Sequence, residues 1–170
     1  MNIIPLYSAS QIQQAVSRTA EEIIAAFGAE EPVVALCLLN GAIWFAADLL
    51  RCLPANFELQ TLRLSSYEGM QSMGNITWHS ALPDCRGKRV LVLDDVLDTG
   101  RTMCSVCEAL RACGATTVLS AVAIDKKGCR EVEYEADFRA LTCEDVFLVG
   151  YGLDFNGKYR NLPYIGYVSR

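Results

Sequence analysis

One short stretch, Arg89 to Thr102 (RVLVLDDVLDTGRT), constrains the fold and function of this chain more than any other. Its four apolar residues Val90–Leu93 are typical of a buried strand in a parallel sheet. Two acids, Asp94 and Asp95, follow immediately, and a polar turn then leads into a helix predicted over 103–112. Because ligands of open α/β sheets bind beyond the carboxyl ends of the strands, we expect a ligand here.

The turn at residues 98–102 has the composition of an anion-binding loop. Backbone N–H groups at a helix N-terminus are unpaired and carry about half a positive charge, which favours a bound phosphate. Gly100 permits close approach of the backbone, and two threonines add hydroxyl donors. Carboxylates repel phosphate, but they accept hydrogen bonds from sugar hydroxyls or bind magnesium, which suits Asp94 and Asp95 to a ribose diol. The stretch therefore predicts a ribose 5-phosphate held at both ends.

Other ligand loops fit this stretch less well. It lacks the GxxxxGK[ST] pattern of a Walker A loop and the GxGxxG pattern of a dinucleotide site. It also lacks the calcium-ligand spacing of an EF-hand. The plain structural alternative is an acidic strand end followed by an ordinary helix cap.

The rest of the chain alternates predicted strands and helices, which indicates an α/β fold with a mostly parallel central sheet flanked by helices. No linker interrupts residues 1–170, so we expect a single domain. Ser8 or Ser10 is the expected N-cap of the first helix and Gly28 its end. The predicted strands are 33–39, 57–64, 76–82, 90–93, 117–124 and 146–149, and the helices are 10–27, 42–53 and 103–112. Ser65–Asn75, with two glycines and no apolar stripe, is predicted to be an exposed, mobile loop.

Amino-acid composition and net charge limit the classes of molecule that this protein is expected to bind. Apolar residues at 52% and charged residues at 21% are typical of a globular protein, and a net charge of −5 argues against nucleic acid and anionic membranes. The apolar run Val33–Leu50 contains Asn40, Gly41 and Asp48, which favours a strand, turn and helix over a membrane span.

Eight cysteines raise the question of disulfides or zinc. The N-terminus has no secretory signal pattern, so we expect reduced thiols and a cytoplasmic protein. Cys104 and Cys107 form a CxxC without a second ligand pair, and they fall in the predicted helix 103–112. We expect them to pack as small apolar residues.

The residues VLVLDDVLDTGRT resemble the phosphoribosyl diphosphate signature of the type I phosphoribosyltransferases. Three further segments, LNGAIWFAADLLR, RLSSYEG and VGYGLDFNGKYRNLPYIGYV, resemble the first active-site loop, the mobile lid and the C-terminal segment of the hypoxanthine-guanine branch. The similarity extends from about Val33 to Val168. It implies the type I phosphoribosyltransferase fold with a small hood from the terminal segments. It also implies the conversion of hypoxanthine and/or guanine with phosphoribosyl diphosphate to IMP or GMP and diphosphate, with Mg²⁺ as the cofactor.

The resemblance implies a role for each matching residue. Asp94 and Asp95 would bind the ribose hydroxyls, and Asp98 would be the catalytic acid or base at purine N7. The 5-phosphate would be bound by Asp98, Thr99, Gly100, Arg101 and Thr102. The purine would be bound by Lys126 at the 6-oxo group, by Phe147 through stacking and by the backbone of Leu148. Asn40, Gly41 and Arg160 would bind diphosphate, Ser66 and Tyr67 would form the lid, and Asp154 would support a magnesium site with Asp94 and Asp95.

Several of these roles have a plain alternative. A lone lysine after a strand, such as Lys126, is usually a solvated charge, and Phe147 also fits a core position. The first loop usually reads Lys-Gly in this branch, often with a cis peptide, whereas this chain has Asn40-Gly41, which supplies no charge.

Two rival functions share the signature. A xanthine-guanine phosphoribosyltransferase has the same acidic pair but should lack the C-terminal segment GYGLDFNGKYRNLPYIG. A pyrimidine-operon RNA-binding regulator on the same fold usually has Tyr where this chain has Asp98, and RNA binding favours a basic face. The family resemblance also suggests homodimers or tetramers.

Overall fold

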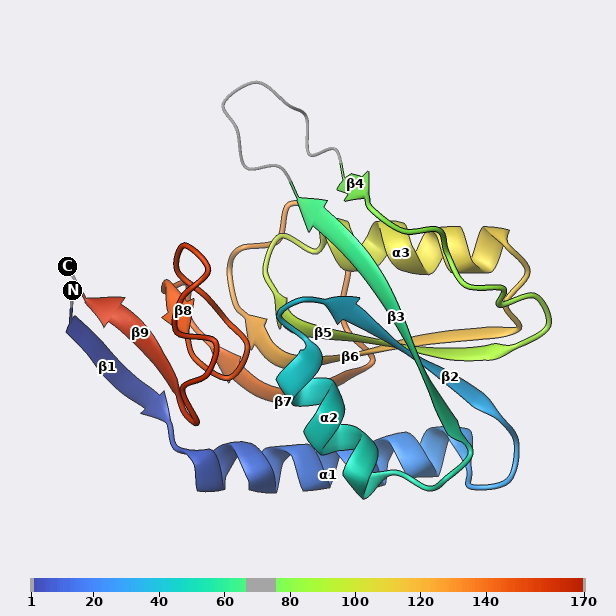
Figure 1. Cartoon of the computed structure of the whole chain (residues 1–170), viewed down its shortest axis with the longest axis horizontal. Coiled ribbons are helices and arrows are strands. Elements are labelled where there is room, and N and C mark those ends of the chain that lie inside the picture. Colours follow the sequence, from blue (N-terminus) through green and yellow to red (C-terminus); the bar gives the residue numbers. More distant parts are fainter. Residues whose placement is uncertain (1, 67–75, 170) are drawn as a thin grey trace.

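The apolar runs of the sequence form a six-stranded sheet in the order β4-β3-β2-β5-β6-β7 (Figure 1). The computed structural model describes residues 2–66 and 76–169, with Ser66 described by its backbone alone. The helices are α1 (Ala9–Phe27), α2 (Ile43–Cys52) and α3 (Arg101–Ala112). The strands are β1 (Asn2–Tyr7), β2 (Val33–Leu39), β3 (Phe57–Ser66), β4 (Ile76–Trp78), β5 (Arg89–Leu97), β6 (Thr117–Lys126), β7 (Phe138–Cys143), β8 (Leu148–Val149) and β9 (Ile165–Ser169).

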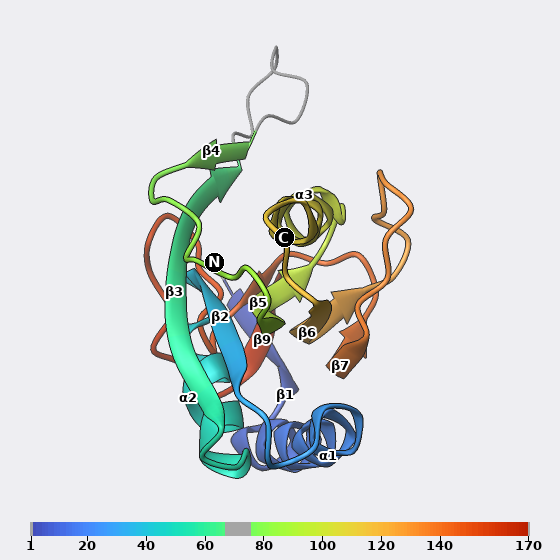
Figure 2. The same ribbon diagram turned by 90° about the vertical axis from the view of Figure 1, so that its right-hand side faces the viewer.

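Helices cover both faces of this sheet. Figure 2 shows α3 on one face and α1 and α2 on the other. Because β2 lies in the middle of the sheet, nearly every residue of its sequence VVALCLL is buried. Each face has its own apolar cluster: Ile23 and Phe45 pack on the side of α1 and α2, and Val106 and Leu110 pack on the side of α3. The predicted α/β fold with a mostly parallel sheet flanked by helices is confirmed.

The central strands run parallel, which decides where the polar loops lie. Strand β2 pairs with β5 from Val33↔Arg89 to Cys37↔Leu93, and β5 pairs with β6 as far as Leu97↔Asp125. Only β4 runs antiparallel to its neighbour, β3, in this sheet of the described residues. The carboxyl ends of β2, β5 and β6 therefore meet at one edge.

The two ends of the chain form a separate small sheet in the order β1-β9-β8. Strand β1 pairs antiparallel with β9 from Asn2↔Ser169 onward, and β8 pairs with the other side of β9. Gly166 lies so close to β1 that an added Cβ would lie 2.9 Å from the carbonyl oxygen of Ile4. This sheet is the hood of terminal segments that the family resemblance implied.

Several element boundaries differ from the sequence predictions. The strand predicted to end at Leu93 continues through the acidic pair to Leu97, because Asp94 and Val96 still pair with β6. Helix α3 begins two residues before the predicted Met103, and the strand predicted over 76–82 ends at Trp78. Strand β3 continues through Ser65 and Ser66, which pair with β4, so the predicted loop begins too early. The rest of that loop, 67–75, lies outside the described residues.

Three strands were missed: β1, β7 and β9. Strand β1 begins only one residue after the chain does, and its partner β9 is more than 160 residues away in sequence. Neither strand has a run of buried apolar residues. Strand β7 alternates buried and exposed positions at the edge of the main sheet.

All eight cysteines are free thiols in this structure. Cys107 is buried within α3, and Cys104 lies half-buried on the same helix. Burial raises the pKa of the Cys107 thiol, so it remains protonated and packs as an apolar group. Within residues 2–66 and 76–169, no helix is long and apolar enough to cross a membrane.

The first helix offers a test of the local structure. Ser8 caps α1: its Oγ accepts from Gln11 N at 3.3 Å, and Gln11 Oε1 accepts from Ser8 N at 2.9 Å. We expect Ser8→Ala to lower the free energy of unfolding by about 1 kcal/mol, because this capping box is lost. Urea denaturation measures the change. Ser10→Ala is the control: Ser10 is exposed inside the first turn, so equal losses from both variants would contradict the assignment of Ser8 as the cap.

Candidate active site

A cavity of about 820 Å³ lies at the carboxyl edge of the central strands. Its lining includes residues from the ends of β2, β3 and β5 and from the C-terminal segment between β8 and β9. The lining contains most of the site residues expected from the sequence: Asn40, Gly41, Asp94, Asp95, Asp98, Thr99, Gly100, Arg101, Thr102, Asp154 and Arg160. The fold therefore brings together segments that are up to about 120 residues apart in sequence.

Asp94 and Asp95 lie in the second half of strand β5, where both are half-buried and line the cavity. Asp94 Oδ1 accepts from Asp95 N at 2.9 Å, and Asp95 Oδ1 accepts from Val96 N at 2.8 Å. Burial and the neighbouring charge of Asp95 raise the pKa of Asp94 well above its usual range. Burial also raises the pKa of Asp95, although hydrogen bonds and the positive charge of Arg160 oppose that rise. The pair is therefore a strained concentration of negative charge that a hydroxyl donor or a cation would relieve.

Two glycines allow the first loop to reach this pair. A Cβ added at Gly41 would lie 1.7 Å from Asp95 Oδ2, so only glycine fits there. A Cβ added at Gly152 would lie 2.0 Å from the carbonyl oxygen of Gly41. Asp95, Gly41 and Gly152 thus stack in direct contact, which joins the acidic pair to the C-terminal segment. A cis peptide bond is present at Leu39–Asn40, one bond before the Asn40–Gly41 peptide.

The loop after Asp98 leads directly into helix α3. Gly100 is the N-cap residue of α3 with a left-handed φ of 84°, and it has no side chain that could cap the helix. The first-turn N–H groups of α3 are therefore open to a ligand in the cavity. Arg101 Nε lies 2.6 Å from Glu131 Oε2, which sets a carboxylate from the loop after β6 beside the anion-binding turn. Glu131 also lines the cavity.

Lys126 at the end of β6 lies next to Asp98. Lys126 Nζ is 3.2 Å from Asp98 Oδ2 and 3.5 Å from Asp145 Oδ1. Its side chain is only 10% exposed, which excludes the solvated charge that a lone lysine usually represents. Burial alone would lower the pKa of Lys126, but the two carboxylates outweigh it and raise that pKa, so the side chain stays a cationic donor.

Phe147 immediately precedes strand β8 and Leu148 is its first residue; like Lys126, neither belongs to the described lining of the cavity. The Phe147 ring is 52% exposed and meets the Phe155 ring edge to face, with centroids 5.5 Å apart. Phe147 is therefore an exposed aromatic residue and not a core residue. Leu148 is buried.

Asp154 and Arg160 both line the cavity and form an ion pair, with Arg160 Nη2 2.7 Å from Asp154 Oδ1. The other carboxylate oxygen of Asp154 accepts from Gly157 N at 2.6 Å. Arg160 also donates to the carbonyl oxygen of Gly152. The guanidinium thus contacts both Gly152 and Asp154, and its positive charge opposes the rise of the pKa of Asp95.

The comparisons with known proteins agree with this geometry. The phosphoribosyl transferase domain family matches residues 6–156. A hypoxanthine-guanine phosphoribosyltransferase from Aquifex aeolicus is 40% identical over 96% of this chain and 93% of its own length. The chain belongs to the hypoxanthine-guanine phosphoribosyltransferase family. It is a pentosyltransferase of purine salvage.

Further relatives of the family extend this result. A hypoxanthine-guanine-xanthine phosphoribosyltransferase from Tritrichomonas foetus is 34% identical over 96% of this chain and 90% of its own length. The crystal structure of a hypoxanthine-guanine phosphoribosyltransferase from Bacillus anthracis superposes with a TM-score of 0.92 at 30% identity and covers 99% of this chain and 100% of its own. The fold implied by the sequence signature is therefore the fold of the family.

Several residues around the site were not expected from the sequence. His79 lines the cavity, and its Nε2 lies 2.7 Å from Ser65 Oγ across strands β3 and β4. Glu131 and Arg130 come from a charged segment, KKGCREVEYEAD, that reads as a solvated loop. Only the tertiary fold carries this segment to the anion-binding turn, so no local pattern could have indicated them. Of the two predicted lid residues, Tyr67 lies outside the described residues and Ser66 is described by its backbone alone.

Metal binding in this family site would depend on oxygen ligands. Within residues 2–66 and 76–169, no group of three or more His, Cys, Asp or Glu side chains is arranged to hold a metal ion. Magnesium is commonly held by one or two carboxylates together with substrate phosphates, while it keeps several waters. The hard carboxylate oxygens of Asp94 and Asp95 fit that kind of binding, in which the substrate supplies the remaining ligands.

We expect the protein to become more stable when one carboxylate of the acidic pair is replaced by a neutral side chain. Because the folded-state pKa of Asp94 is raised, the folded protein holds a proton that the unfolded chain releases near its ordinary pKa of about 3.9. Stability is therefore lost as pH rises through the window between those two values. We expect Asp94→Asn to raise the thermal midpoint by several degrees at pH 7, without ligand, because Asn retains the acceptor oxygen and removes the charge.

Thermal melts from pH 3 to pH 8 measure this effect, with Asp84→Asn as the control for an exposed acid. The gain should shrink as pH falls toward 3, where both carboxyl groups are protonated. The same variant, and the double variant with Asp95→Asn, should bind phosphoribosyl diphosphate more weakly. A loss of stability at pH 7 together with normal binding would contradict both the repulsion and the diol role.

Proposed function

We propose that this protein transfers the 5-phosphoribosyl group of phosphoribosyl diphosphate to hypoxanthine and/or guanine. The products are IMP or GMP and diphosphate. The observation that carries this proposal is that Asp94, Asp95 and the turn 98–102 line one cavity, while Lys126, outside the described lining, pairs with Asp98 at 3.2 Å. A sugar phosphate would need the acidic pair and the turn for its diol and its phosphate, and a purine would need Asp98 and Lys126 beside them.

The ribose 5-phosphate binds at two places. The N–H groups at the start of α3 and the hydroxyl groups of Thr99 and Thr102 bind the 5-phosphate. The ribose 2- and 3-hydroxyls donate to Asp94 and Asp95, which accept without any change of backbone. Because these hydroxyls replace water at a half-buried acidic pair, binding relieves the repulsion between the two carboxylates.

The purine lies between Asp98, Lys126 and the Phe147 ring. Lys126 donates to the 6-oxo oxygen, which favours 6-oxopurines because the amino group of adenine would offer a donor instead of an acceptor. The exposed face of Phe147 stacks on the ring, and the backbone of Leu148 reads its edge.

The transfer itself breaks the bond between C1 of the ribose and the diphosphate oxygen and forms a bond from C1 to purine N9. The proton on purine N7 passes to the carboxylate of Asp98, whose charge Lys126 already compensates on the other side. The positive charge that builds on the ribose ring lies near Asp94 and Asp95. Ser66 and Tyr67, as the lid, would exclude water from this centre.

Diphosphate leaves toward the first loop and the C-terminal segment. The guanidinium of Arg160 and the backbone at Asn40-Gly41 stabilise its charge, since all three line the cavity. Asn40 donates a neutral hydrogen bond where the branch usually has a lysine, so Arg160 supplies the fixed positive charge on this side. Asp154, which holds Arg160 at 2.7 Å, keeps that guanidinium in place.

Magnesium, held by Asp94 and Asp95 and supported by Asp154, would neutralise charge on the diphosphate and the diol when bound. We infer a cytoplasmic enzyme, because eight free thiols suit a reducing compartment. Its partners are phosphoribosyl diphosphate and 6-oxopurine bases, without nucleic acid or membrane, and homodimers or tetramers are the expected assemblies. A single domain over residues 1–170 remains our expectation.

A panel of bases tests the proposed substrates. We expect product with phosphoribosyl diphosphate, magnesium and either hypoxanthine or guanine, and none with adenine or uracil, because Lys126 is a fixed donor. Formation of nucleotide is followed by absorbance or chromatography. Xanthine is included because one relative is named for it. A preference for xanthine would favour the xanthine-guanine alternative, and no product with any 6-oxopurine would refute the proposal.

The role of Asp98 has its own test. We expect Asp98→Asn to lower kcat by about 10²- to 10⁴-fold, because an amide cannot accept the N7 proton. The KM for phosphoribosyl diphosphate should change little, since the amide preserves the shape of the turn. Asp145→Asn is the matched control, because it removes the other carboxylate beside Lys126 without touching the proposed base. Near-normal turnover of Asp98→Asn would exclude it from proton transfer.

A further inference from the structure

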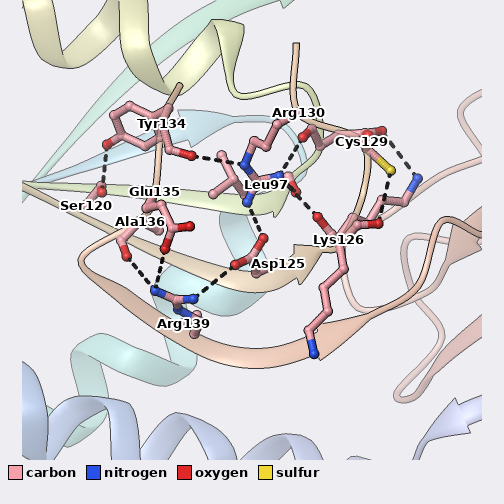
Figure 3. Close-up of polar contacts among 12 residues, drawn as sticks. Leu97, Ser120, Asp125, Lys126, Cys129, Arg130, Tyr134, Glu135, Ala136 and Arg139 are labelled. Atoms are coloured by element: carbon pink, nitrogen blue, oxygen red, sulfur yellow. Dashed lines mark hydrogen bonds and ion pairs between the residues drawn. The ribbon is translucent and has the colours of Figure 1, made fainter. Parts of the chain in front are cut away.

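Arg130 lies behind the site, in the loop between β6 and β7, and its guanidinium contacts three separate segments (Figure 3). Its Nη1 donates to the carbonyl oxygens of Leu97 at 3.0 Å, Asp98 at 2.6 Å and Lys126 at 3.1 Å. Its Nη2 donates to the carboxylate of Asp125. The side chain is 24% exposed, and Arg130 is not among the described residues that line the cavity. It therefore acts on the site from outside.

The two residues after Arg130 complete this contact. Glu131 N and Val132 N donate to the carbonyl oxygen of Thr99 at 2.9 and 3.3 Å. Three consecutive carbonyl groups, those of residues 97, 98 and 99, are thus all directed at the segment 130–132. In a planar trans peptide, the C=O of one residue and the N–H of the next point in opposite directions.

The consequence is a fixed direction for the backbone donors of the anion-binding turn. Since the carbonyls of Asp98 and Thr99 point toward 130–132, the N–H groups of Thr99 and Gly100 point away from it, toward the cavity that both residues line. Carbonyl oxygens in the same position would repel a phosphate. The packing of Gly100 against this segment is equally close, because an added Cβ would lie 3.1 Å from Val132 and 3.3 Å from Arg130.

The same guanidinium also fixes the ends of β5 and β6 relative to each other. It bridges the carbonyls of Asp98 and Lys126, the two residues whose side chains form the ion pair at the proposed purine position. Asp125, which is only 7% exposed, balances its charge. A buried carboxylate and guanidinium in this arrangement hold a single geometry, since the planar fork matches several acceptors at once.

We propose that Arg130 is a positioning residue for phosphoribosyl transfer. It turns the carbonyls of the anion-binding turn away from the cavity and sets the spacing between Asp98 and Lys126. This inference rests on the proposed function, because it assigns Arg130 to the phosphate and purine sites of that reaction. Arg130 itself touches no substrate.

The chain offers a matched control in Arg139. This arginine also pairs with Asp125, at 3.4 Å, and its other contacts are to Glu135 and the carbonyl of Ala136 (Figure 3). It shares the buried carboxylate with Arg130, whereas its described contacts include none with the turn. Replacing Arg139 therefore removes only an ion pair with Asp125 and local contacts of the loop between β6 and β7. Replacing Arg130 removes an ion pair with Asp125 and also the hydrogen bonds that orient the carbonyl groups of residues 97 and 98.

The experiment measures the dissociation constant of ribose 5-phosphate by titration calorimetry for the wild type and for Arg130→Met, Arg130→Lys and Arg139→Met. We expect Arg130→Met to weaken binding by one to two orders of magnitude, on the order of the loss when a binding group is misplaced by about 1 Å. Arg130→Lys keeps the charge but cannot span four acceptors from one nitrogen, so it should also weaken binding at a near-normal melting temperature. Arg139→Met should bind within about twofold of the wild type, because the turn keeps its contacts.

The binding stoichiometry from the same titration distinguishes a positioning role from a role in fold stability alone. A residue that only stabilises the fold would lower the fraction of binding-competent protein and leave the dissociation constant of that fraction unchanged. The inference is overturned by unchanged affinity in folded Arg130→Lys, or by equal weakening in Arg139→Met. A wild type that fails to bind ribose 5-phosphate would overturn the proposed function itself, and with it this role. Steady-state kinetics adds that KM for both substrates should rise in Arg130→Lys.

Discussion

Parallel pairing of β2, β5 and β6 is the constraint on which the rest of this structure depends. Because parallel strands end at the same edge, the register Cys37↔Leu93 and Leu97↔Asp125 places three loops side by side. One loop has a glycine pressed against an acid, the second combines acids with an anion-binding turn, and the third brings a lysine and Arg130. The chemistry of the site follows from this shared edge, since no single loop contains all the groups that a sugar phosphate and a base require.

The acidic pair shows what this arrangement costs in stability. Burial and the neighbouring carboxylate raise the pKa of Asp94, so a negative charge on each member of the pair is unfavourable in the free protein. Arg160, which opposes the rise of the pKa of Asp95, compensates only one member of the pair. A ligand that brings hydroxyl donors or a cation relieves this repulsion. Part of the favourable binding free energy would therefore come from removing an unfavourable interaction that is present in the free protein. A site of this kind therefore lowers the stability of the free protein.

The sequence predicted the parts of the site that lie close together along the chain. The acids and the turn at 98–102 could be read from one stretch, because a strand end and a helix start are local patterns. The extension of β5 to Leu97 could not be read, since apolar periodicity stops at Asp94 while strand pairing with β6 continues. The contact of Arg130 with the turn could not be predicted from the sequence either. Its segment is charged and irregular, and only contacts across more than thirty residues reveal that its guanidinium is directed inward.

The hood is coupled to the core by contacts that no local pattern shows. Tyr151 donates to Asp48 Oδ2 at 2.9 Å, and its neighbour Gly152 packs on the carbonyl of Gly41. Asp48 lies in the middle of α2, the helix that directly follows the first loop, so this helix and the loop before it both contact the segment after β8. Arg160 is held by the same segment through the carbonyl of Gly152. The Arg160 guanidinium is therefore held by a segment that itself packs on the first loop and on α2.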